Sequence, residues 1–128
     1  MIGELVRILL VDDHPVVRAG LRAVLSGEAD LEVIGEASDT SEAIRLSGQL
    51  SPDVVLMDLR LGAGPSGAVA TAAIRALPSP AAVLVLTNYD TDADILSAVA
   101  AGASGYLLKD APPAELIAAV RAAAAGES

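Results

Sequence analysis

The sequence predicts an α/β fold, in which helices wind on both sides of a doubly wound, five-stranded parallel sheet with strand order 2-1-3-4-5. Three observations lead to this prediction. Short apolar runs of strand length alternate with stretches of helical periodicity, a pattern typical of parallel sheets. The chain has 128 residues, which suffices for one domain. Hydrophobic residues make up 53% of it and aromatic residues only 2%, so the core is expected to be aliphatic.

Five runs are predicted to be strands. Four are almost wholly apolar and are expected to be buried: Val6–Val11, Val54–Met57, Ala82–Leu86 and Tyr106–Leu108. The other, Leu31–Glu36, alternates apolar and polar side chains, which indicates a strand with one wetter face. Such a strand suits the edge of the sheet, which is where the order 2-1-3-4-5 places the second strand. Right-handed crossovers leave few other topologies.

A helix signal lies in each gap after a strand. The signals are Pro15 at a first helical position, a capping box at Asp39–Glu42, a helical stretch at Ala68–Leu77, Thr91 with Asp94, and the pair Pro112 and Pro113. The fourth helix is expected to end at Gly102. The complete order is β-α repeated five times, the (βα)5 arrangement of flavodoxin-like folds.

The composition excludes several classes of protein. Lys and Arg total 8 against 17 Asp and Glu, and the formal net charge of −9 argues against direct nucleic-acid binding by this domain. The absence of cysteine excludes disulfides, thiolate metal sites and cysteine nucleophiles. No apolar run approaches the ~18 residues of a membrane span, and the first residues lack the features of a signal peptide. We therefore expect a cytoplasmic domain without membrane contact.

Polar side chains follow each of the four apolar strands. Asp12 and Asp13 come after the first strand, Asp58 after the third, Thr87 after the fourth and Lys109 after the fifth. The carboxyl ends of parallel strands share one edge of the sheet, and ligands bind there. A single acid at a strand end is an ordinary turn or N-cap residue, but three acids, a threonine and a lysine at one edge together indicate a functional site.

Three carboxylates at one edge would either take up protons or be joined by a cation. Their mutual repulsion at ~4 Å is about 4 kcal/mol per pair in a medium of intermediate dielectric. Oxygen ligands favour a hard ion, and Mg²⁺ fits because it accepts a few carboxylates and keeps several waters. Mg²⁺ together with Lys109 and Thr87 would suit a phosphoryl group. Asp58, alone at the end of a central strand, is the predicted nucleophile, and Asp12 and Asp13 are the predicted metal pair.

The stretches around these residues resemble the receiver domain of response regulators. The resemblance is carried by Ile8–Pro15 (ILLVDDHP), Asp53–Leu59 (DVVLMDL), Leu84–Thr87 (LVLT) and Gly102–Lys109 (GASGYLLK). It covers essentially the whole chain, with residues 1–125 as the domain and 126–128 as the start of a linker. The C-terminal part resembles the receivers of LuxR-type two-component transcription regulators. DNA binding would therefore belong to a helix-turn-helix domain outside these residues.

The resemblance implies a signalling role, with catalysis limited to the domain's own phosphorylation and dephosphorylation. A partner histidine kinase would donate a phosphoryl group to Asp58. Asp13, Asp58 and the backbone carbonyl of Arg60 would bind Mg²⁺, and Asp12 would assist through water. Lys109 would contact the acceptor carboxylate and then a phosphoryl oxygen.

The resemblance also implies a conformational switch. Thr87 would hydrogen-bond a phosphoryl oxygen, and Tyr106 would rotate into the space that Thr87 leaves. Arg60 and Tyr89 would flank the path of the hydrolytic water and tune the lifetime of the phosphorylated state. The face around Tyr106, or the first and last helices, could each support a homodimer.

Several local features allow other interpretations. The loop Leu61–Gly67 is one residue longer than the family pattern and contains a G-x-G-x-x-G sequence, which is the dinucleotide fingerprint in another context. Here it follows the third strand and contains Pro65, so flexibility beside the site is the favoured reading. Asp110 stands where many receivers have proline. His14, the only histidine, is interpreted as a loop residue that caps the first helix rather than as a metal ligand.

Two other functions stay open on the sequence. The first is an Mg²⁺-dependent phosphatase with an aspartyl nucleophile, although that class usually has a second acid two residues after the nucleophile, where this chain has Arg60. The second is a degenerate receiver that binds partners without phosphorylation. The complete set of Asp12, Asp13, Asp58, Thr87 and Lys109 argues against it.

Overall fold

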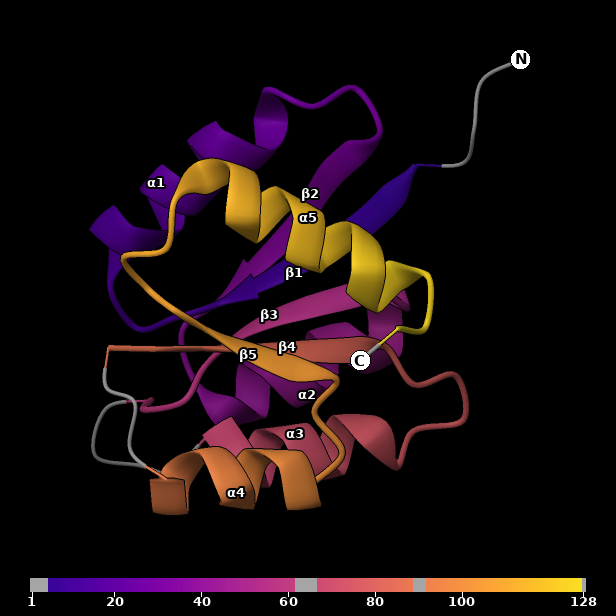
Figure 1. Ribbon diagram of the computed structural model, residues 1–128. Helices are drawn as coiled ribbons and strands as arrows, with labels where there is room; N and C mark the ends of the chain where they lie inside the picture. The colour runs from indigo at the N-terminus through magenta and orange to yellow at the C-terminus, as the bar shows by residue number, and fades with distance from the viewer. Residues whose placement is uncertain (1–4, 62–66, 89–91, 128) are drawn as a thin grey trace.

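The computed structural model describes residues 5–61, 67–88 and 92–127, and within it strands and helices alternate (Figure 1). The strands are β1 (Val6–Val11), β2 (Leu31–Ala37), β3 (Val54–Asp58), β4 (Ala82–Thr87) and β5 (Gly105–Leu108). The helices are α1 (Pro15–Ser26), α2 (Thr40–Leu50), α3 (Gly67–Arg75), α4 (Asp92–Ala100) and α5 (Pro113–Ala124). No helix among these is both long and apolar enough to cross a membrane.

All strand pairs are parallel, and the order β2-β1-β3-β4-β5 confirms the predicted topology. Helices α1 and α5 cover one face of the sheet, and α2, α3 and α4 cover the other (Figure 1). Because the strands run in one direction, their carboxyl ends meet at one edge, and this edge carries the site described below.

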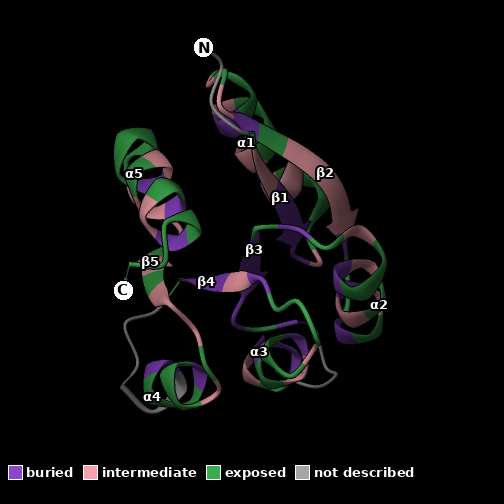
Figure 2. Ribbon diagram, turned by 90° about the vertical axis from the view of Figure 1, so that its right-hand side faces the viewer, coloured by how far each residue is buried: buried purple, intermediate pink, exposed green. Residues whose placement is uncertain are grey.

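The core lies in two layers, one on each face of the sheet. In β1, Ile8 and Leu10 face the α1 and α5 layer, whereas Leu9 and Val11 face the α2 to α4 layer. This alternation follows from the period of two in a strand. Every residue of β3 is buried, since this strand lies at the centre of the sheet and is covered on both faces (Figure 2). Each such aliphatic side chain contributes about 1.5–3 kcal/mol on burial.

The prediction that the last strand is buried was wrong. Tyr106 is 43% exposed and Leu108 38% exposed, and residues of β5 alternate between half-buried and exposed. The physical reason is topological, because β5 pairs only with β4 and forms an edge of the sheet. The apolar run does not distinguish an edge strand with exposed apolar side chains from a buried one.

The helix ends follow the sequence signals with some differences. Asp39 caps α2 as predicted, accepting a hydrogen bond from Glu42 N at 2.8 Å, but the Glu42 carboxylate accepts from Ser38 N and not from Asp39 N. Gly102 follows α4 with φ +107°, which favours glycine. The predicted start of α4 at Thr91 lies outside the described residues, as do the side chains of residues 92–94.

Candidate functional site

The end of β1 holds the paired acids. Asp12 directly follows Val11, and its N–H donates to Ala37 O in β2 at 3.1 Å. Its side chain is only 1% exposed, and its Oδ1 accepts a hydrogen bond from His14 N at 2.8 Å. This local bond turns the chain between β1 and α1 and fixes the Asp12 carboxylate at the edge of the sheet.

The end of β3 holds the third acid. Asp58 is the last residue of this strand, pairs in register with Leu86 of β4 and is 4% exposed. Its Oδ1 accepts a hydrogen bond from Arg60 N at 3.1 Å. Burial raises the pKa of the Asp58 carboxyl; the Arg60 hydrogen bond opposes this shift, the charge of Asp12 adds to it, and the charge of Lys109 opposes it.

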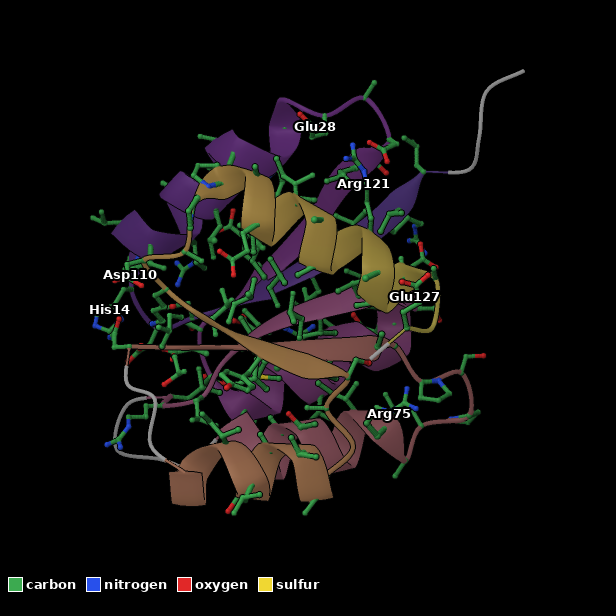
Figure 3. The ribbon with its side chains drawn as sticks, in the orientation of Figure 1. His14, Glu28, Arg75, Asp110, Arg121 and Glu127 are labelled. Carbon is green, nitrogen blue, oxygen red and sulfur yellow. The ribbon has the colours of Figure 1, made fainter. Side chains whose placement is uncertain are left out.

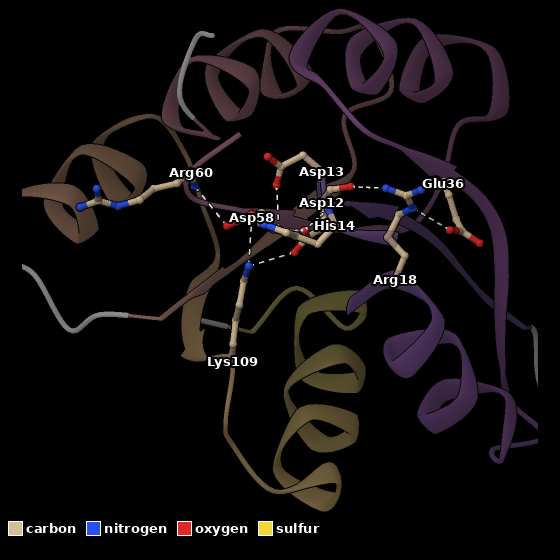
Figure 4. Close-up of polar contacts among 8 residues, drawn as sticks. All are labelled: Asp12, Asp13, His14, Arg18, Glu36, Asp58, Arg60 and Lys109. Atoms are coloured by element: carbon tan, nitrogen blue, oxygen red, sulfur yellow. Dashed lines mark hydrogen bonds and ion pairs between the residues drawn. The ribbon is translucent and has the colours of Figure 1, made fainter. Parts of the chain in front are cut away.

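Lys109 joins the two strand ends (Figure 4). Its Nζ lies 3.0 Å from Asp12 Oδ2 and 3.2 Å from Asp58 Oδ2. Its backbone N–H donates to Thr87 O at 2.8 Å, which holds the start of the β5–α5 loop against β4. Burial opposes the charge on the ammonium, but the hydrogen bond to Asp12 and the charge of Asp58 outweigh this effect and raise the pKa of Lys109.

The acids form a set that could hold a metal ion. One ligand atom from each of Asp12, Asp13, His14 and Asp58 lies within 4.8 Å of the others. Asp13 Oδ1 is buried and has no hydrogen-bond partner among the described residues, although His14 Nδ1 lies 3.0 Å from it. A carboxylate oxygen that lacks a donor, next to two further carboxylates, fits a divalent cation.

His14 differs from its predicted role. It occupies the N-cap position of α1, but its side chain makes no capping hydrogen bond. Its Nδ1 instead lies 3.1 Å from Asp12 Oδ1 and 3.0 Å from Asp13 Oδ1, and the imidazole is largely exposed. His14 thus lies at the predicted place before the first helix, but its ring contacts the acidic pair and does not cap the helix.

The remaining predicted residues lie around this cluster. Thr87 is buried at the end of β4, one position beyond the partner of Asp58. Tyr106 is exposed on β5. Arg60 contacts Asp58 through its backbone N–H, and its guanidinium points away from the acids (Figure 4). Tyr89 lies outside the described residues, and so do Gly62 and Gly64 of the G-x-G-x-x-G sequence.

Gly67 is a residue whose role the sequence analysis missed. It begins α3, donates its N–H to Leu59 O at 2.9 Å, and packs directly on the end of β3. A Cβ atom at this position would lie 2.4 Å from Asp58 O and 2.9 Å from Leu59 Cα. The glycine is therefore required for close packing behind Asp58 and not for flexibility. The signal was its place at the start of a helix shortly after a strand.

The fold and the site together define a class of signalling domain. The model of the response regulator receiver domain matches residues 8–121, and the chain belongs to this family. It is therefore the receiver domain of a two-component response regulator, with Asp12, Asp13, Asp58 and Lys109 gathered in an acidic pocket. The phosphatase alternative does not agree with this assignment.

The chain is also similar to particular transcription regulators. The chain is 48% identical over 123 residues to the transcriptional regulatory protein LiaR of Bacillus subtilis, covering 96% of this chain and 58% of that protein. It is 41% identical over 120 residues to the nitrate/nitrite response regulator protein NarP of Escherichia coli, covering 94% and 55%. The chain thus spans about half the length of the curated relatives that it matches.

Solved structures give the same result. A LuxR-family two-component response regulator from Aurantimonas sp. SI85-9A1 superposes with a TM-score of 0.90 at 44% identity, covering 97% of this chain and 88% of the other. The NarL signal receiver domain from Mycobacterium tuberculosis gives a TM-score of 0.92 at 38% identity, covering 98% and 100%. These similarities place the chain among receivers of LuxR-family regulators.

Proposed function

We propose that Asp58 accepts a phosphoryl group from a histidine kinase. The observation that carries this proposal is the position of Lys109 Nζ, 3.0 Å from Asp12 and 3.2 Å from Asp58. The Lys109 ammonium lies between the buried carboxylates of Asp12 and Asp58, where its positive charge can compensate the negative charge of an incoming phosphoryl group. Asp58 is the acceptor because it stands at the end of the central strand.

The residues divide the chemistry among them. An Asp58 oxygen bonds to phosphorus while the phosphorus–nitrogen bond of the kinase phosphohistidine breaks, and the bonding electron pair returns to the imidazole. Asp13, Asp58 and the Arg60 backbone carbonyl would hold Mg²⁺, with Asp12 assisting through water. The ion supplies positive charge for the phosphoryl oxygens when it is bound. Lys109 then contacts one of those oxygens.

The switch is proposed to pass through Thr87 and Tyr106. The Thr87 hydroxyl moves to donate to a phosphoryl oxygen, and Tyr106 turns from its exposed position into the space that is left. The surface of α4, β5 and α5 changes, because the phosphorylated site stabilises one of two packings. Arg60 and Tyr89 tune the lifetime of the phosphorylated state by flanking the path of the attacking water.

The rest of the protein is proposed to respond to this surface. Two of the relatives named above, LiaR and NarP, are about twice as long as this chain. We assign residues 1–125 to the receiver domain and residues 126–128 to the start of a linker that leads to a DNA-binding helix-turn-helix domain. The receiver itself, with a net charge of −9, does not bind DNA, and it acts in the cytoplasm, with a homodimer as one form of the phosphorylated state.

The test uses a small phosphoryl donor. Incubation with acetyl phosphate and Mg²⁺ should add the mass of one phosphoryl group to the intact protein, and Asp58→Ala should abolish the gain. The matched control is Asp110→Asn, which removes an exposed carboxylate beside Lys109 and should leave the gain unchanged. An unmodified wild-type protein would contradict the proposal and favour a phosphorylation-independent receiver. Rapid hydrolysis of unrelated phosphate esters would favour a phosphatase.

A further inference from the structure

A half-buried arginine, Arg18, contacts the backbone of the acidic pair. Arg18 lies in the first turn of α1, and its side chain is 17% exposed. Its Nη1 donates to the backbone carbonyl of Asp12 at 2.5 Å, and its Nε donates to Glu36 Oε1 at 2.8 Å (Figure 4). One planar guanidinium therefore bridges the end of β1 and the end of β2.

Glu36 is itself held by a second arginine. Arg22 lies one turn further along α1, and its Nε and Nη2 donate to Glu36 Oε2 at 2.8 and 2.6 Å. The hydrogen bond from Arg22 is the largest cause of a lowered pKa of Glu36; burial opposes it, and the bond from Arg18 adds to it. The two arginines thus share one carboxylate, but the bond to the Asp12 carbonyl comes from Arg18.

The Asp12 carbonyl belongs to the same peptide unit as the N–H of Asp13, so its direction sets the direction of the chain at the acidic pair. The Asp12 residue is held at its N–H by Ala37 O, at its carboxylate by Lys109, and at its carbonyl by Arg18. We propose that Arg18 is a positioning residue, which orients the Asp12–Asp13 peptide so that the carboxylates of the pair face Asp58. This inference rests on the proposed metal-assisted function.

Positioning and simple electrostatics predict opposite results. If Arg18 acted only through its charge, its removal would strengthen the binding of a cation, because a positive group close to the site would be gone. If Arg18 positions the ligands, its removal weakens cation binding. Loss of partners that orient metal ligands typically weakens metal affinity by about 10- to 100-fold.

The experiment compares two arginine variants that share the same carboxylate. Mn²⁺ is the probe, because its electron paramagnetic resonance signal gives the concentration of free ion and hence the binding affinity. Arg18→Met should weaken Mn²⁺ binding at least about tenfold. Arg22→Met, the matched control, also loses bonds to Glu36 but leaves the Asp12 carbonyl bond, and its affinity should stay within about twofold of wild type. In metal-free protein, the amide resonance of Asp13 should move in Arg18→Met and stay in place in Arg22→Met.

The outcomes separate the two proposals. A wild-type protein that does not bind Mn²⁺ overturns the proposed metal-assisted function. A wild type that binds, with Arg18→Met binding equally or more tightly, overturns the positioning role alone. Equal losses in both variants would assign the effect to the α1–β2 contact through Glu36 and would also overturn it. If Arg18→Met does not fold, Arg18→Lys takes its place, because an ammonium keeps the charge without the planar bridge, and the same direction is expected.

Discussion

Asp58 stands in an environment that disfavours its own charge. Its pKa is raised by burial in the folded protein, so folding increases its affinity for a proton. The folded state holds this proton at pH values where the unfolded chain has lost it. The contribution of Asp58 to the free energy of unfolding therefore falls as the pH rises from its pKa in the unfolded chain through its higher pKa in the folded protein. Above the folded-state pKa the full cost of burying the charge applies.

The stability of Asp58→Asn tests this penalty. The variant removes the charge but keeps the shape, so without Mg²⁺ it should melt at a higher temperature than wild type at pH 7.5. The difference should shrink as the pH is lowered to 4, since Asp58 then becomes protonated. Thermal unfolding followed by circular dichroism measures both, with the exposed Glu32→Gln as the control for a general charge effect. A lower melting temperature at pH 7.5 would show that the pair with Lys109 outweighs the burial penalty.

The sequence predicted those site residues that lie at the carboxyl ends of strands, because residue type and strand order are enough to place them. Asp12, Asp58 and Lys109 meet as expected because the topology brings them to one edge. His14 and Arg18 were missed as parts of the site, because their contacts depend on side-chain conformation at the start of α1. A cation in the first turn of a helix opposes the helix dipole, which is a signal that Arg18 has a specific acceptor.

Packing between elements supports the site from behind. Gly67 at the start of α3 lies against the backbone of Asp58 and Leu59, and backbone atoms cannot yield as a flexible side chain can. Gly67→Ala should therefore lower the free energy of unfolding by about 1–3 kcal/mol. It should also slow phosphorylation, since the end of β3 must shift.

Gly48 provides the matched control for this variant. It lies within α2, where an added Cβ meets nothing within 4 Å, so Gly48→Ala should stabilise the protein by about 0.5–1 kcal/mol. Urea denaturation of both variants gives the comparison. Equal effects at the two positions, or an unchanged phosphorylation rate in Gly67→Ala, would contradict the account of close packing behind Asp58.

The sequence predicted which helices and strands exist, and their order along the chain, better than it predicted how far each is buried. All helices and strands were expected. Where the structure describes both, the observed ends mostly lie within one or two residues of the predicted ends. The exposure of β5 was not predicted, because an apolar run is compatible with an edge strand as well as a central one. The capping box at Asp39 was predicted, but Glu42 reaches one residue further back, to Ser38.

The whole molecule connects residues far apart in the chain. Lys109 and Asp12 are 97 positions apart and 3.0 Å apart in space. The site and the last described residues lie at opposite ends of the molecule: His14 and Asp110 are at one end and Glu127 at the other (Figure 3). The same view shows Arg121 of α5 beside Glu28, and it bonds both Glu28 and Asp30 at 2.8 Å. The proposed switch would carry the change at Asp58 to the surface of α4, β5 and α5 by way of Tyr106.

Tyr106 offers a probe of this passage. The chain has two tyrosines and no tryptophan, so in a Tyr89→Phe background Tyr106 is the only strong emitter. Addition of beryllofluoride with Mg²⁺ should reduce the quenching of Tyr106 fluorescence by acrylamide, because the 43% exposed ring turns inward. The same background with Asp58→Ala should show no change. Unaltered quenching in the presence of a bound mimic would remove Tyr106 from the switch.

Of the three neighbouring carboxylates, Asp58 is the one that we propose carries an acyl phosphate. Borohydride reduces an acyl phosphate to an alcohol, so it converts a phosphorylated aspartate to homoserine and marks the position permanently. After treatment with acetyl phosphate and Mg²⁺, peptide mapping should find homoserine at position 58. Homoserine at position 12 or 13, or at no aspartate, would contradict the account.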